Sequence, residues 1–415
     1  MLVRDTHITI AVFIPMLFRL NLINSNRLTT AISAMAIALS LAACGGSTTT
    51  GSSPSPGDTA ASPGASPGAS PVAATGTPAA NTKLALASDV AITAAGASFP
   101  APLYQRWFQD FNKINPKVQI NYQSTGSGAG VEQFTKGTVD FGASDTGMTD
   151  DEIAKVPADK GVLLLPMTAG SIVIGYNLAD VPELKLPRDV YSEIFQGKIT
   201  KWNDPKIAAA NPGAKLPDQS ITVVHRSDGS GTTAVFTKHL SAISPDWKAA
   251  VGDGKTVQWP KTGTFIGAKG NEGITAQLLQ TAGSIGYVEY GYAKNNNVKF
   301  ASLQNKAGTF VVPNDASASA ALATAPLPED LRAFIVDPEG ATSYPIVTYT
   351  WMLVPKKVAD PNKAKAIEAM VEYGLNEGQK VSSELGYVPL PQSVREKVAA
   401  AADGISADYK IEVAK

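Results

Sequence analysis

Cysteine is almost absent from this chain of 415 residues, which contains a single one, Cys44. One cysteine has no partner for a disulfide bond within the chain. Histidine is also scarce: of three, only His225 and His239 lie beyond the first hundred residues, and neither belongs to a His-Glu-x-x-His pattern. The sequence therefore predicts no catalytic residue, no metal site and no cofactor.

An excess of charge of either sign is missing as well. The chain has 35 Lys and Arg residues against 36 Asp and Glu residues, and its formal net charge is −1 at pH 7. Because basic runs and interleaved basic and aromatic residues are lacking, nucleic acid is not expected as a partner. The pattern Gly-x-x-x-x-Gly-Lys-Ser/Thr is absent too, which argues against a nucleotide-hydrolysing protein.

The apolar run 31–40 near the N-terminus follows two arginines and is too short and too rich in alanine for a membrane span. It leads into Leu-Ala-Ala and then Cys44, which resembles a bacterial lipoprotein cleavage site. We predict a lipoprotein signal segment over residues 1–43 and a lipid anchor on Cys44, with an incidental thiol as the alternative. A start at Met16 would leave an ordinary signal of this type.

Residues 44–89 consist mainly of Ser, Thr, Pro, Gly and Ala and contain a near-repeat over 61–71. Such a composition buries too little apolar surface to offset the entropy of ordering, so we predict a disordered tether. A flexible chain of this length spans about 40 Å root-mean-square. The Gly-x-Ser-x-Gly match at 64–68 lacks the flanking strand and helix of a hydrolase elbow.

Beyond residue 90, strand and helix patterns alternate, which favours an α/β fold. An amphipathic helix is expected over 102–113, where one face carries Leu103, Trp107, Phe108 and Phe111. Strands are expected at 91–93, 118–122, 139–143, 172–176, 221–224 and 346–354, with a second helix from 130 to 136 and a third following the strand at 221–224. In such sheets ligands bind beyond the carboxyl ends of the strands.

Four turns rich in small polar residues follow these strands. They span residues 96–100, 124–130, 143–146 and 226–232. One such turn is usually an ordinary connection, but four at strand ends predict a shared binding site. Hydroxyls and glycine amides donate hydrogen bonds without a full charge, and the last turn leads into a helix, whose N-terminus attracts anions.

Arg226, Asp228 and Asp145 indicate which anion the site would select. Arg226 supplies a planar, permanent positive charge, and we expect an ion pair with Asp228 to hold its guanidinium. A carboxylate such as Asp145 repels an anion unless that anion carries a proton, which hydrogen phosphate does and sulfate does not. The alternative role for Asp145 is that of a helix N-cap.

Five segments, at 96–102, 139–145, 197–205, 226–232 and 286–290, resemble in order those of phosphate-binding proteins of the bacterial high-affinity phosphate ABC transporter, the PstS family. The resemblance runs from about residue 92 to 394 and implies a type II periplasmic-binding-protein fold. It implies two α/β lobes joined by crossings near Ser171 and Pro345, with a ligand cleft between them. Lobe I would comprise 90–171 plus 345–415, and lobe II 172–344.

The resemblance also implies which residues bind phosphate. Lobe I would contribute Ser98, Phe99, Ser127 and Asp145; lobe II would contribute Arg226, Ser230, Gly231 and Thr232, with Asp228 orienting the arginine. The family commonly has threonine where this chain has Ser98, and a paired serine next to the position of Ser127. The hydroxyl is retained at both positions.

The function expected from these features is an extracytoplasmic (periplasmic), lipid-anchored receptor that captures inorganic phosphate and delivers it to the permease subunits of an ABC transporter. It would be a monomer, with no enzymatic activity. The alternatives are a sulfate or molybdate receptor, a secreted phosphatase on the same scaffold, and a phosphate sensor for a surface kinase.

Overall fold

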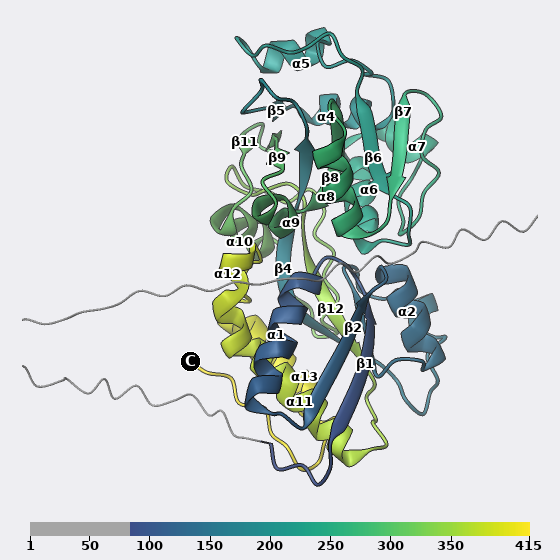
Figure 1. The fold of residues 1–415 in the computed structure, drawn as a ribbon, viewed down its shortest axis with the longest axis vertical. Coiled ribbons are helices and arrows are strands. Elements are labelled where there is room, and N and C mark those ends of the chain that lie inside the picture. The colour runs from purple at the N-terminus through teal and green to yellow at the C-terminus, as the bar shows by residue number, and fades with distance from the viewer. Residues whose placement is uncertain (1–83) are drawn as a thin grey trace, which may run out of the picture. The chain divides into compact units, whose positions relative to one another are not determined.

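A computed structural model describes residues 84–415 and confirms the α/β fold (Figure 1). The predicted signal segment, the lipid anchor at Cys44 and nearly all of the tether lie outside the described residues. The strands are β1 (Val90–Gly96), β2 (Val118–Ser124), β3 (Phe141–Ser144), β4 (Leu163–Tyr176), β5 (Lys185–Leu186), β6 (Thr222–Arg226), β7 (Thr264–Ala268), β8 (Ser284–Glu289), β9 (Lys299–Phe300), β10 (Ser302–Gln304), β11 (Phe310–Val311) and β12 (Val347–Val354).

The helices connect these strands and cover their faces. They are α1 (Ala101–Ile114), α2 (Ser127–Lys136), α3 (Asp150–Ile153), α4 (Arg188–Phe195), α5 (Pro205–Ala210), α6 (Gly231–Ile243), α7 (Pro245–Ala250), α8 (Gly270–Gln280), α9 (Tyr290–Asn295), α10 (Asp315–Ala323), α11 (Pro361–Leu375), the 3-10 helix η1 (Glu377–Val381), α12 (Ser382–Leu385) and α13 (Gln392–Ala402). None of the helices in this described part is long and apolar enough to cross a membrane.

Nine strands form one continuous sheet, in the order β2-β1-β3-β12-β4-β8-β6-β7, with β9 beside β4. The long strand β4 is shared by two halves of this sheet. Its first part, up to Ser171, pairs antiparallel with β12, and its last part, from Ile172, pairs antiparallel with β8. The change of partner coincides with the crossing expected near Ser171, and Pro345 lies just before β12. The division into lobe I (90–171 plus 345–415) and lobe II (172–344) stays a prediction.

Helix α1 forms as its apolar spacing predicts. Leu103, Trp107, Phe108 and Phe111 are all buried, and the Trp107 indole donates a hydrogen bond to a backbone carbonyl of η1 at 2.8 Å. In Figure 1, α1, α11 and α13 lie on one side of the strands in this half, and α2 lies on the other. The central strands β3, β4 and β12 are therefore buried on both faces, whereas β1 and the edge strand β2 expose some of their residues.

Several predicted boundaries were wrong. The strand expected at 172–176 is only the last part of β4, which begins at Leu163, and the strand expected at 91–93 extends to Gly96 in β1. Helix α2 begins at Ser127 instead of Gly130, because Gly126 adopts a φ of 92° and lets the chain turn directly into the helix. Strand β3 begins at Phe141 instead of Val139. Just before it, Asp140 bonds to Thr93 of β1 with one backbone and one side-chain group: its backbone N–H donates to the Thr93 carbonyl at 2.8 Å, and its carboxylate accepts the Thr93 N–H at 2.7 Å. The carboxylate thus takes the place of a backbone acceptor, and the regular strand starts one residue later.

Candidate functional site

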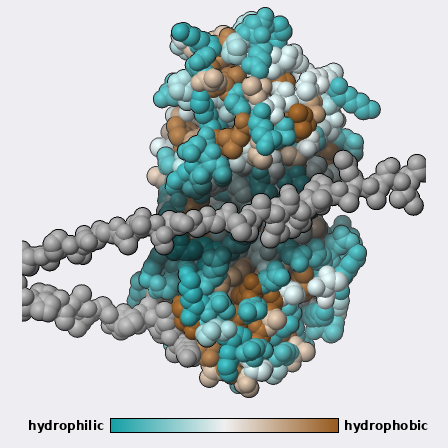
Figure 2. All heavy atoms as spheres, viewed as in Figure 1, coloured by the Kyte–Doolittle hydropathy of each residue, from teal (hydrophilic) through white to brown (hydrophobic). Residues whose placement is uncertain are grey.

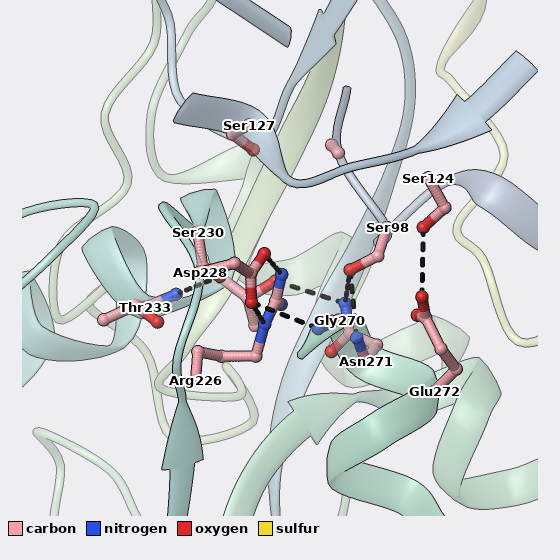
Figure 3. A network of polar contacts seen from close by, with 12 residues as sticks. Ser98, Ser124, Ser127, Arg226, Asp228, Ser230, Thr233, Gly270, Asn271 and Glu272 are labelled. Carbon is pink, nitrogen blue, oxygen red and sulfur yellow. Dashed lines mark hydrogen bonds and ion pairs between the residues drawn. The ribbon is translucent and has the colours of Figure 1, made fainter. Parts of the chain in front are cut away.

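All four turns that the sequence singled out meet across the two halves. The turn after β2, with Ser127, lies beside Asp145. Strands β1 and β3 are parallel neighbours, so the turns after them, with Ser98 and Asp145, lie side by side. Strand β6, in the other half, leads into the turn with Arg226 and then into α6. Figure 3 shows Ser98 and Ser127 from the first half facing Arg226 and Asp228 from the second. The predicted site residues of the described part thus gather in one place.

Arg226 is held by the ion pair expected from the sequence. Its Nε and Nη2 donate to Oδ1 and Oδ2 of Asp228 at 2.7 and 2.6 Å, and Asp228 Oδ1 also accepts the Gly270 N–H at 3.1 Å. Burial lowers the pKa of Arg226, but its bonds to Asp228 outweigh this effect and leave the pKa above its ordinary value. The guanidinium, in a residue only 4% exposed, is thus fixed as a cation.

Asp145 is a carboxylate surrounded by donors. Its Oδ1 accepts the Thr350 hydroxyl at 2.9 Å, and its Oδ2 accepts the Thr232 hydroxyl at 3.2 Å and contacts Ser127 Oγ at 3.5 Å. Burial raises the pKa of Asp145 to about 6, although these hydroxyls and the Arg226 charge act in the opposite direction. The side chain caps no helix: the next helix, α3, is capped by Thr149. The N-cap alternative for Asp145 is therefore excluded.

The N-terminus of α6 completes the side of the site that faces Asp145. Ser230 is its N-cap and accepts the Thr233 N–H at 3.0 Å. Gly231 and Thr232 occupy the first turn, where backbone N–H groups have no partner within the helix. A Cβ at Gly231 would lie 2.5 Å from Ser127 Oγ, so glycine is needed for α6 to approach the other half.

Ser98 and Phe99 lie in the turn after β1. Ser98 is 1% exposed and its Oγ accepts two hydrogen bonds, from the backbone N–H and from Nδ2 of Asn271, each at 3.0 Å. The Phe99 ring packs against Gly170, where a Cβ would approach it to 2.9 Å, and its carbonyl accepts the Tyr387 hydroxyl. Phe99 can therefore serve an anion only through its backbone.

Sequence reasoning missed Thr350 and Asn271. Thr350 lies within β12 and reaches Asp145 only through the pairing of β12 with β3, which no local pattern indicates. Asn271 follows Gly270 at the start of α8, and its turn comes directly after β7. No strand was predicted at 264–268, and the charged residues Lys269 and Glu272 distinguish this turn from the four turns rich in small polar residues, so no local signal pointed to Asn271.

The arrangement offers many neutral donors, one paired cation and one carboxylate. Within residues 84–415, no group of three or more His, Cys, Asp or Glu side chains is placed so that it could hold a metal ion. A small oxyanion that carries a proton matches such a set, because its oxygens accept from the donors and its hydroxyl donates to Asp145.

Comparisons with known proteins give a consistent result. A family model described as PBP superfamily domain matches residues 57–375. The phosphate-binding protein PstS of Pasteurella multocida is 45% identical over 326 residues, covering 78% of this chain and 90% of that protein. The phosphate-binding protein PstS of Haemophilus influenzae is 43% identical over 307 residues, covering 73% and 90%.

A solved structure has the same fold. It is that of a high affinity periplasmic phosphate-binding protein (PfluDING) bound with phosphate. It matches 78% of this chain and 96% of its own, with a TM-score of 0.64 and 21% sequence identity. At this identity the likeness concerns the fold alone, and it confirms the predicted periplasmic-binding-protein architecture.

Proposed function

This chain belongs to the PstS family of phosphate-binding proteins, and from this premise we propose that it captures inorganic phosphate outside the cytoplasm and delivers it to the permease of an ABC transporter. Members of this family are binding proteins and not enzymes. The main support for this proposal is the environment of Asp145, a buried carboxylate that lies among hydroxyl donors and beside a fixed guanidinium.

The proposed phosphate ligands come from both halves of the sheet. They are Ser98, Phe99, Ser127 and Asp145 on one side and Arg226, Ser230, Gly231 and Thr232 on the other, with Asp228 holding Arg226. Hydrogen phosphate would donate its proton to Asp145 and accept bonds from the remaining groups through its other oxygens. Sulfate would place an unprotonated oxygen against the carboxylate, which disfavours a sulfate or molybdate receptor.

We further propose that the halves act as lobes, with lobe I formed by 90–171 and 345–415 and lobe II by 172–344. The change of strand partner after Ser171 in β4 supports this division. The halves touch through polar contacts: the Gly128 N–H donates to the Gly229 carbonyl at 2.8 Å, and Thr232 donates to Asp145. Where the surface between the halves is visible in Figure 2, it is hydrophilic. Phosphate bound between them would hold the lobes together through polar contacts.

The location of the protein rests on the sequence features of its first ninety residues. A lipid anchor on Cys44 and a tether over 44–89 would hold a monomeric receptor near the membrane and the permease. The change Cys44→Ala should release the protein from membranes in the native host. Retention of that variant in the membrane fraction would remove the anchor from the proposal.

An equilibrium titration tests the central function. Labelled phosphate should bind tightly to the chain from residue 45 onward, and a thousandfold excess of sulfate or molybdate should not displace it. Strong competition by sulfate would contradict the proposed selectivity. In the same preparation, a chromogenic phosphate ester with added divalent metal ions should give no turnover; steady hydrolysis would favour the phosphatase alternative.

A further inference from the structure

Asn271, the second residue of α8, contacts hydroxyls from both halves of the molecule. Its Nδ2 donates to Ser98 Oγ at 3.0 Å and to Thr232 Oγ1 at 3.3 Å, and its backbone N–H also donates to Ser98 Oγ at 3.0 Å. The side chain is fully buried. Figure 3 shows Asn271 between the ion pair of Arg226 with Asp228 and the turn that contains Ser98.

The orientation of the Asn271 amide follows from its partners. Its Oδ1 accepts the backbone N–H of Glu289 at 3.0 Å, and a backbone N–H can only donate. The other terminal atom is therefore the NH₂ group, and its two hydrogens point to Ser98 and Thr232. Donors and acceptor of this side chain are all engaged, so its orientation is fixed.

These bonds determine what the two hydroxyls can do. A hydroxyl has one proton and two lone pairs. Both lone pairs of Ser98 Oγ are occupied by Asn271, so this hydroxyl can act toward a ligand only as a donor. Thr232 Oγ1 accepts from Asn271 and, at 3.5 Å, from Arg226 Nη1, so its proton is directed to Asp145 or to an anion near it.

We propose that Asn271 is a positioning residue that makes Ser98 and Thr232 obligatory donors, so that a proton on the bound oxyanion is confined to the oxygen facing Asp145. This inference rests on the proposed phosphate binding. It adds that selectivity comes from two sets of residues: Asp145 accepts the proton, and Asn271 prevents two hydroxyls from accepting it elsewhere.

Two variants separate this role from simple packing. Asn271→Ala leaves Ser98 and Thr232 free to rotate, and phosphate affinity should fall about tenfold, the effect of losing one or two oriented hydrogen bonds. Asn271→Asp keeps the shape but offers the hydroxyls an acceptor, so at pH 8 affinity should fall about 100-fold.

A pH series provides a readout that packing alone would not change. When the carboxylate introduced by Asn271→Asp is protonated, it can donate again, so phosphate affinity relative to wild type should recover as pH falls from 8 to 5. Asn271→Ala should show no such recovery. The ionisable groups around Asn271 are Arg226 and Asp228 before α6, Asp145 after β3, Glu289 of β8, Tyr292 of α9, which donates to the Ser98 carbonyl, and Glu272 of α8 itself. They are common to all variants, so comparison with wild type at each pH removes their titration.

Asn305→Ala is the matched control, because Asn305 is also fully buried and bonds to backbone carbonyls of residues 340–343, away from this site. It should bind phosphate like wild type. If wild type itself does not bind phosphate, the proposed function fails first. If wild type binds and Asn271→Ala stays within twofold of it, or both Asn271 variants show the same pH profile, the inference about Asn271 is wrong. Should Asn271→Asp not fold, as judged by circular dichroism, the affinity of Asn271→Ala decides alone.

Discussion

Replacing Asp145 by asparagine tests the selectivity of the proposed site most directly. The change keeps the shape of the side chain, removes its charge and turns one acceptor atom into a donor. In the wild-type protein this carboxylate is 1% exposed and accepts hydroxyls of Thr350 and Thr232 at 2.9 and 3.2 Å. Little water can reach it, so the loss of its charge should act on the bound anion nearly unscreened.

The expected change in affinity follows from two interactions, the hydrogen bond from phosphate to Asp145 and the repulsion between Asp145 and sulfate. A hydrogen bond to a charged group contributes about 1.5–3 kcal/mol, and 1.4 kcal/mol is about tenfold in affinity, so phosphate should bind Asp145→Asn roughly 10- to 100-fold more weakly. Two unit charges about 4 Å apart repel by roughly 4 kcal/mol at the effective dielectric of protein sites. Sulfate is relieved of this repulsion and should gain about 1,000-fold in affinity. Together with the loss for phosphate, the phosphate-to-sulfate affinity ratio should fall roughly 10,000- to 100,000-fold.

The assay is isothermal titration of wild type and variant with phosphate and with sulfate at pH 8 and constant ionic strength. Asp140→Asn is the matched control, since Asp140 bonds to Thr93 and Lys363 outside the site and undergoes the same chemical change. The phosphate-to-sulfate affinity ratio of Asp140→Asn should equal that of wild type. An unchanged ratio in Asp145→Asn would refute the reasoning, because it would mean that no proton is shared with this carboxylate.

Three further predictions concern pH and packing. Burial raises the pKa of Asp145 from 3.8 to about 6, so the protonated carboxyl becomes a donor below pH 6; sulfate affinity of wild type should rise as pH falls from 8 to 5, while that of Asp145→Asn stays flat in the same titrations. Because the folded pKa is above the unfolded one, the folded state binds the extra proton and stability is lost as pH rises through this window. In urea unfolding without phosphate, the free energy of unfolding of Asp145→Asn should therefore exceed that of wild type by up to about 3 kcal/mol at pH 8. Near pH 4 the two free energies should be about equal. Equal values at pH 8 would contradict the raised pKa. Gly231→Ala would place a Cβ 2.5 Å from Ser127 Oγ and should weaken phosphate binding more than about 100-fold, whereas Gly404→Ala, which meets nothing within 4 Å, should leave the Kd unchanged.

Local sequence patterns predicted the fold and most of the residues of the site, but not which residues contact one another. The apolar spacing of α1 and the small-residue turns are encoded within a few neighbouring residues, so they were visible in the sequence. Thr350 became part of the site because Trp351 pairs with Ser144 in the antiparallel register of β12 with β3. That register joins segments about two hundred residues apart, and it is set by packing of the whole sheet.

The glycines of the turns at 124–130 and 226–232 have a second role, which the structure shows. From sequence alone they indicated free amide donors for an anion. In the structure, Gly128 and Gly229 meet backbone to backbone, so that a Cβ on Gly128 would lie 3.2 Å from the Gly229 Cα. A Cβ on Gly126 would lie 2.3 Å from Asp228 Oδ2. A side chain at either position would hold the two turns apart. The same glycines that expose amides therefore also permit the close approach of the halves, which the proposed site needs to have ligands from both sides.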